Sequence, residues 1–124
     1  MNSQFTMLVR IVLGITLVVF GSNMFLHFIP LPPPTGPAGD FMNSLGATGY
    51  IFPVVGMLEV IIGVMLLLKK WVAFALILLA PISINILLFH IFLAIPGLGI
   101  AVVIVIFNAI LIYKHWKQYI PLFH

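Results

Sequence analysis

Long apolar segments separated by short polar turns make up most of this chain. Four of them cover residues of about 5–28, 47–68, 71–94 and 98–113. Each is close to the roughly 20 residues that a helix needs to cross the hydrocarbon core of a bilayer. None alternates apolar and polar positions with the period of two that a membrane barrel requires. The pattern predicts an all-α protein, a transmembrane four-helix bundle that forms one membrane domain over residues 1–124.

The connections between these segments differ in charge. The first, residues 29–45, is rich in proline and has no Lys or Arg, and the third, residues 95–97, is uncharged. The lysines lie in the second connection and in the C-terminal tail: Lys69, Lys70, Lys114 and Lys117. Because basic residues mark cytoplasmic loops, we expect both termini to be cytoplasmic. Residues 29–45 are predicted to form an extended external loop.

The composition agrees with a membrane location. Of the 124 residues, 64% are hydrophobic and only 6% are charged, whereas a soluble domain carries about a quarter charged residues. The lipid bilayer is therefore the first partner that we expect. The formal net charge of +3 does not indicate nucleic-acid binding, because the basic residues flank apolar spans and do not cluster on one face. The absence of cysteine excludes thiolate nucleophiles and iron–sulfur ligation.

Glu59 is one of two acidic residues, and it lies in the middle of the uncharged stretch 47–68. A carboxylate near the bilayer midplane is costly unless another group compensates it, which makes Glu59 a candidate functional residue. Arg10 is the only basic residue inside an apolar span. We interpret the two as an inward-facing ion pair. In the alternative, Arg10 extends to the cytoplasmic interface and a protonated Glu59 is hydrogen-bonded.

Glycines recur every seven residues on the first two predicted helices. Gly14 and Gly21 lie on the first, and Gly49, Gly56 and Gly63 lie on the second. Seven residues are close to two helical turns, so each set forms a smooth stripe along which membrane helices can approach closely. With both helices centred in the bilayer, Gly21 and Gly56 differ in height by roughly 3 Å, and so do Gly14 and Gly63. We expect these four residues to form the packing face of an antiparallel hairpin.

Two asparagines also lie near the predicted midplane. Asn85 on the third helix and Asn108 on the fourth are close in height to Glu59. Pro81 is expected to kink the third helix and free the carbonyl of Ile77 near Asn85. The polar groups are interpreted either as interhelical hydrogen bonds or as the lining of a ligand pocket.

Two histidines lie toward the external end. His27 lies at the outer end of the first helix, and His90 lies in the outer part of the third. Residues of this type on different helices can ligate haem or a metal ion, or hold a quinone oxygen. A single histidine inside a membrane is more often a hydrogen-bonded packing residue, so both interpretations stay open.

Short motifs along most of the chain resemble those of the DoxX family. The first helix carries Arg10-x-x-Leu13-Gly14 followed by Gly21 and Met24, although the family often has a lysine where Met24 stands. The second carries Gly56-x-x-Glu59-x-x-x-Gly63, and the third carries Pro81, Asn85 and His90. The resemblance implies a four-helix bundle in the bacterial inner membrane, related to subunits of quinone-linked oxidoreductases. It marks four ligand-binding candidates: Arg10, Glu59, Asn85 and His90.

Three functions follow as hypotheses. The first is a non-catalytic subunit of a redox or cell-envelope complex, with other membrane subunits or a homo-oligomer as partners. Its pocket would take a quinone or lipid, with Arg10, Asn85 or His90 donating hydrogen bonds to quinone carbonyls. The second is a structural scaffold or assembly factor for other membrane proteins. The third is a small proton-coupled transporter built around Glu59, although the pronounced charge bias argues against the dual topology of such transporters.

Overall fold

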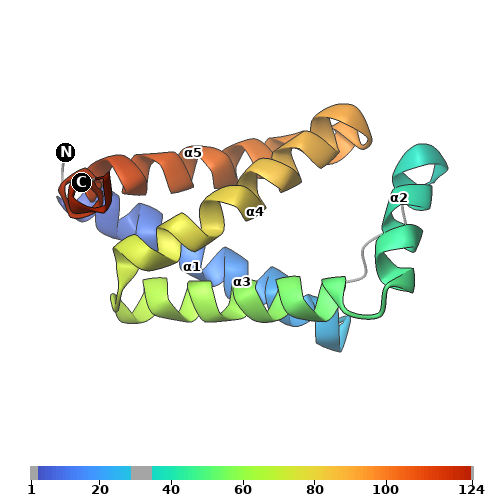
Figure 1. Ribbon diagram of the computed structural model, residues 1–124, viewed down its shortest axis with the longest axis horizontal. Helices are drawn as coiled ribbons and strands as arrows, with labels where there is room; N and C mark the ends of the chain where they lie inside the picture. Colours follow the sequence, from blue (N-terminus) through green and yellow to red (C-terminus); the bar gives the residue numbers. More distant parts are fainter. Residues whose placement is uncertain (1–2, 29–34, 124) are drawn as a thin grey trace.

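The computed structural model describes residues 3–28 and 35–123, and these fold into helices joined by turns (Figure 1). No β-strand occurs within these two ranges, so the predicted all-α class is confirmed. The long helices are α1 (Ser3–Leu26), α2 (Gly36–Ala47), α3 (Ile51–Leu68), α4 (Val72–Phe92) and α5 (Leu98–Lys114). The short ones are the 3₁₀ turn Ile95–Gly97, α6 (Trp116–Tyr119) and the 3₁₀ turn Ile120–Phe123.

Within the described part of the chain, four helical units are long and apolar enough to cross a membrane. They are α1, α3, α4 and the continuous stretch Ile95–Lys114. Their bounds agree with the predicted segments to within a few residues. The largest shift is at α3, which begins at Ile51 because Gly49 adopts a positive φ of 79° in the turn that precedes it. The chain thus has the helices of a multi-pass membrane protein.

The prediction of an extended loop over residues 29–45 is wrong where the structure describes it. Residues 36–45 belong to helix α2, whereas residues 29–34 lie outside the described part of the chain. Pro37 occupies the first turn of α2, where its missing N–H removes no helical hydrogen bond and its fixed φ favours the helix. Proline therefore starts a helix here.

Helix α2 stands across the end of the bundle, roughly perpendicular to the other helices (Figure 1). The ring of Phe41 meets Phe89 of α4 edge-on, with ring centroids 5.8 Å apart. Most of α2 is exposed, and its buried residues are Ala38 and Gly39. This short amphipathic element therefore covers the end of the bundle opposite the lysines.

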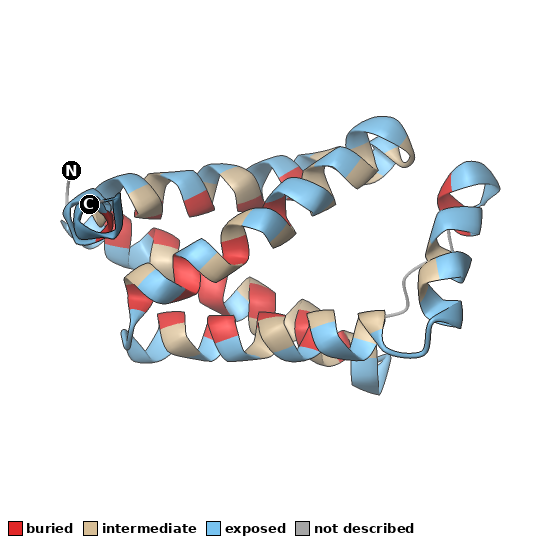
Figure 2. Ribbon diagram, in the orientation of Figure 1, coloured by how far each residue is buried: buried red, intermediate tan, exposed pale blue. Residues whose placement is uncertain are grey.

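The four spans form two antiparallel hairpins, α1 with α3 and α4 with α5 (Figure 1). The α1–α3 interface is the most extensive. At the end where α3 turns into α4, the hairpins pack together, and toward α2 the ribbons separate. Burial follows the same gradient: α4 buries residues up to Ser83 but none from 84 to 92 (Figure 2).

The glycine pairing expected from the sequence is confirmed. A Cβ built on Gly21 would lie 2.8 Å from the carbonyl oxygen of Gly56, and one on Gly63 would lie 2.7 Å from that of Gly14. Distances this short mean that the two backbones are in direct contact at both levels. Gly49 is the exception, because a Cβ there would meet no atom within 4 Å. Of the three glycines predicted for the second helix, Gly56 and Gly63 therefore lie at the contact with α1, and Gly49 does not.

The C-terminal helix α6 closes the end that carries the lysines. Tyr119 is only 3% exposed, and its hydroxyl donates a 2.8 Å hydrogen bond to the carbonyl oxygen of Ala73 in the first turn of α4. Burial raises the pKa of the Tyr119 hydroxyl, which keeps it protonated as a donor. Trp71, Tyr113 and Trp116 are exposed at the same end, as expected for aromatic side chains at a membrane interface.

We expect Gly21→Ala to destabilise the protein by about 1–3 kcal/mol, because the new methyl group would push the α3 backbone away. The free energy of unfolding, measured by steric trapping in bicelles, tests this. Gly99→Ala is the matched control, since its Cβ meets open space. Equal stability of the two variants would contradict close contact between α1 and α3.

Candidate functional site

Glu59 is buried between α3 and α1 and is 4% exposed. Its Cβ would lie 2.9 Å from a Cβ on Gly21, so the glycine is what leaves room for this side chain. Oε2 of Glu59 has no hydrogen-bond partner, and among the described residues no other buried side-chain oxygen or nitrogen lacks one. Buried polar groups in proteins are almost always hydrogen-bonded. The carboxyl group of Glu59 therefore contributes no hydrogen bond through Oε2 that would explain its presence as a requirement of folding.

Arg10 lies on the face of α1 that packs against α3, as Gly21 does, but closer to the end of the bundle that carries the lysines. Its Nη1 donates a hydrogen bond to the carbonyl oxygen of Leu66, which also accepts the backbone N–H of Lys69 at 3.3 Å. The last four carbonyls of a helix have no helical partner and carry partial negative charge. Arg10 therefore caps the C-terminus of α3 with a cation that comes from α1.

The predicted Arg10–Glu59 ion pair is not formed. Leu66, which binds the arginine, lies seven residues beyond Glu59, or about 10 Å along α3. The Leu66 carbonyl in the last turn of α3 gives Arg10 an acceptor near the helix end, so the side chain does not reach the carboxyl group. The alternative prediction is supported for Arg10, which reaches toward the interface, but the Oε2 atom of Glu59 has no hydrogen bond.

Asn108 joins α5 to α4 through hydrogen bonds inside the bundle. Its Nδ2 donates to the carbonyl oxygen of Leu76 at 3.2 Å, and its Oδ1 lies 3.0 Å from the hydroxyl oxygen of Ser83. That hydroxyl is also 3.0 Å from the carbonyl oxygen of Ala80, so it donates to one acceptor at a time. Of the two sequence interpretations, interhelical hydrogen bonding is the one that holds for Asn108.

Asn85 does not join this network. Its side chain is exposed, and Nδ2 donates at 2.8 Å to the carbonyl oxygen of Pro81 one turn earlier in α4. The expected inner polar cluster therefore does not include Asn85, because this face of α4 points outward, and the acceptor of its hydrogen bond is the carbonyl of Pro81. Ser83 takes its place in the interior.

Ser83 was missed by the sequence analysis, because the nearly uniform apolar sequence of α4 does not mark which face is buried. It lies four residues after Leu79 and seven after Leu76, which are both fully buried. A hydroxyl at this spacing lies on the core face of the helix, since residues four and seven apart share a face. A small polar residue on that stripe indicates a hydrogen bond to a neighbouring helix.

The histidines have local contacts. Nδ1 of His90 lies 3.0 Å from the carbonyl oxygen of Ala94, and its ring fills the space where Gly97 has no side chain. This fastens the turn between α4 and α5. His27 is exposed just after α1, with a positive φ of 51°. Within residues 3–28 and 35–123, no group of three or more His, Cys, Asp or Glu side chains is arranged to hold a metal ion.

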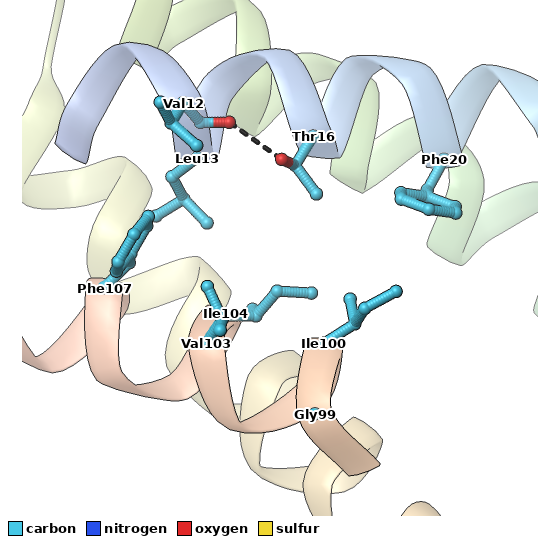
Figure 3. Close-up of a pocket in the computed structure, with 9 residues that line it drawn as sticks. All are labelled: Val12, Leu13, Thr16, Phe20, Gly99, Ile100, Val103, Ile104 and Phe107. Atoms are coloured by element: carbon cyan, nitrogen blue, oxygen red, sulfur yellow. Dashed lines mark hydrogen bonds between the residues drawn. The ribbon is translucent and has the colours of Figure 1, made fainter. Parts of the chain in front are cut away.

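An apolar cavity of about 290 Å³ lies between α1 and α5 (Figure 3). Its walls are Val12, Leu13, Thr16, Phe20, Gly99, Ile100, Val103, Ile104 and Phe107. The only side-chain polar group among these is the hydroxyl of Thr16, which donates at 2.8 Å to the carbonyl oxygen of Val12. Figure 3 shows the side chains of the two helices facing each other across this space. We call it the α1–α5 cavity.

None of the four predicted site residues lines the α1–α5 cavity. The sequence analysis did not find the cavity, because apolar residues that line a void and apolar residues that face lipid form the same pattern. Glycine at position 99 was the one usable signal, since it removes a side chain from a helix face. It indicates a close approach or a hollow without distinguishing the two.

Comparison of the chain with models of protein families, with curated proteins and with solved structures found no match. The resemblance to the DoxX family therefore stays a prediction.

We expect Glu59→Met to stabilise the protein by about 1–3 kcal/mol, because it replaces an unsatisfied buried polar group with an apolar chain of similar length. Chemical unfolding in detergent micelles measures the change. Glu59→Gln is the control, because it keeps both the shape and a polar group. A large loss of stability in the methionine variant would show that the carboxyl group contributes to folding, and it would contradict this prediction.

Proposed function

We propose that this chain is a non-catalytic membrane subunit that holds the hydrocarbon part of a lipid-soluble molecule in the α1–α5 cavity. The apolar lining is the observation that carries the proposal. The volume of about 290 Å³ is close to the lower end of the roughly 300–1,000 Å³ typical of ligand pockets. A cavity of this size suits the acyl chain of a lipid or the isoprenoid tail of a quinone.

The chemistry of the walls supports binding without reaction. No titratable side chain lines the cavity, and the Thr16 hydroxyl already has an acceptor. The donors first considered for a quinone ring have other partners: Arg10 binds Leu66, Asn85 binds Pro81 and His90 lies against Ala94. The proposal therefore concerns the tail of the ligand, and the head group lies elsewhere.

Selectivity in such a site comes from shape. Thr16 lies near the middle of α1, so hydrocarbon chains surround the cavity in a bilayer. Moving a tail from lipid into the cavity gains little hydrophobic energy, because both environments are apolar. The gain is dispersion contact with the walls, in which the flat ring of Phe20 and the branched chains of Ile100 and Ile104 take part.

The DoxX resemblance supports a place in the bacterial inner membrane, within a redox or cell-envelope complex.

A scaffold for other membrane proteins is the second candidate. Residues 84–92 of α4, which include no buried side chain, favour it, because they leave a helix face on which another subunit can pack. Proton-coupled transport has less support, since Glu59 does not line the α1–α5 cavity.

We expect Val103→Trp to lower occupancy of the α1–α5 cavity about tenfold, a loss of roughly 1.4 kcal/mol, because the indole would fill the space. Photo-crosslinking with a diazirine-bearing fatty acid and a diazirine-bearing isoprenoid chain measures the occupancy. The matched control is Val102→Trp, which changes the adjacent residue outside the lining. Equal labelling of both variants and the parent protein would refute the proposed site.

The orientation proposed from the lysines has its own test. The chain lacks cysteine, so single-cysteine variants report position without background. We expect Ser44→Cys in α2 to react with an impermeant maleimide in intact spheroplasts, and Gln118→Cys to react only after permeabilisation. Both residues are exposed and uncharged, which leaves the charge bias unchanged. The reverse pattern would place the termini outside.

A further inference from the structure

A second cavity, of about 400 Å³, lies at the end of the bundle where α1 begins and α5 ends. We call it the basic cavity. Its charged walls come from three different elements: Arg10 from α1, Lys69 from the C-cap of α3 and Lys114 from the last turn of α5. His115 adds an imidazole beside them. Three of the five Lys and Arg residues of the chain thus surround one hollow.

No aspartate or glutamate side chain lies beside these charges to compensate them. The only acidic residues are Asp40 and Glu59, and neither lines the basic cavity. Glu59 precedes Lys69 by ten residues, about 15 Å along α3. Asp40 belongs to α2 at the opposite end of the molecule (Figure 1). Cations that converge without a counter-charge repel one another, so an anion that enters this space gains attraction from all of them.

The fold fixes part of this lining in place. The Arg10 guanidinium is anchored through Nη1 to the Leu66 carbonyl, and a guanidinium has five N–H donors in all. Nδ1 of His115 lies 2.9 Å from the carbonyl oxygen of Leu111, which orients the ring and leaves Nε2 as its second polar atom. Two polar groups of the cavity are therefore positioned before any ligand arrives.

Part of the lining of the basic cavity is apolar. Leu111 of α5 is 1% exposed, and Met7 of α1 adds an exposed apolar side chain. The cavity lies at the ends of two membrane-spanning stretches, the level at which lipid head groups meet water. A ligand with a charged group and an apolar neighbour fits this lining.

We propose that the basic cavity binds a phosphate group, the chemistry shared by anionic phospholipid heads and soluble phosphates. Arginine can bind two phosphate oxygens at once, and lysines act as point charges toward the rest. Basic pockets between membrane helices are suited to anionic head groups, and each Lys or Arg near the surface contributes about one factor of five in affinity. The site is independent of the α1–α5 cavity and of the function proposed for it.

The test compares two variants of equal charge. Lys69→Gln with Lys114→Gln removes two cations from the lining. Lys70→Gln with Lys117→Gln removes two cations from the same end but outside the lining, and all four lysines are exposed. Each full-length protein is reconstituted in phosphatidylcholine nanodiscs that contain a minority of phosphatidylglycerol. Native mass spectrometry then counts retained phosphatidylglycerol. Circular dichroism confirms that both variants fold.

We expect the cavity variant to retain phosphatidylglycerol about 30-fold less tightly than the parent, and the control variant to stay close to the parent. A second arm adds inorganic phosphate to protein in a zwitterionic detergent without anionic lipid. Phosphate binding that is lost only in the cavity variant would identify a soluble source, and retention of phosphatidylglycerol alone would identify the lipid. Equal losses in both variants, or no binding of either ligand, would overturn the proposal.

Discussion

Direct contact between the backbones of α1 and α3 is the constraint on which the rest of the structure depends. Inside a bilayer the hydrophobic effect does not drive helices together, so their association rests on close packing. Gly21 against Gly56 and Gly14 against Gly63 provide that packing at two levels. Because Arg10 and Glu59 also lie at the contact between α1 and α3, the register of the glycines decides where each of these two charged residues is placed.

The register separates the opposite charges of the two helices. Arg10 donates to the Leu66 carbonyl in the last turn of α3. Glu59, which lies seven residues before Leu66, is enclosed beside Gly21. The partial negative charge of a helix end thus takes the place of a carboxylate as the partner of the arginine. One end of the molecule is left with a surplus of positive charge, and the interior holds a carboxyl oxygen without a partner.

Both cavities lie between α1 and α5, but the chemistry of their walls differs. At the depth of Thr16 and Val103 the walls are apolar, and at the level of Arg10 and Lys114 they are basic. This order matches the change of environment from hydrocarbon to head groups across half of a bilayer. The protein thus presents to each layer of the membrane a hollow of the corresponding chemistry.

The sequence by itself determined the features that depend on local periodicity. Runs of apolar residues set the four spans, and glycines at a spacing of seven set the contact of α1 with α3, because helix geometry relates sequence distance directly to position. Helix α2 was missed, since proline is compatible both with a loop and with the first turn of a helix.

Only the tertiary structure decided which groups meet. The partner of Arg10 is a backbone carbonyl, and every residue carries one, so no residue type marks it in advance. Asn85 faces outward and Ser83 inward because of how α4 is rotated against its neighbours, which its nearly uniform apolar sequence does not specify. The cavities arise where two surfaces fail to fill the space between them, and that depends on the shapes of both helices together.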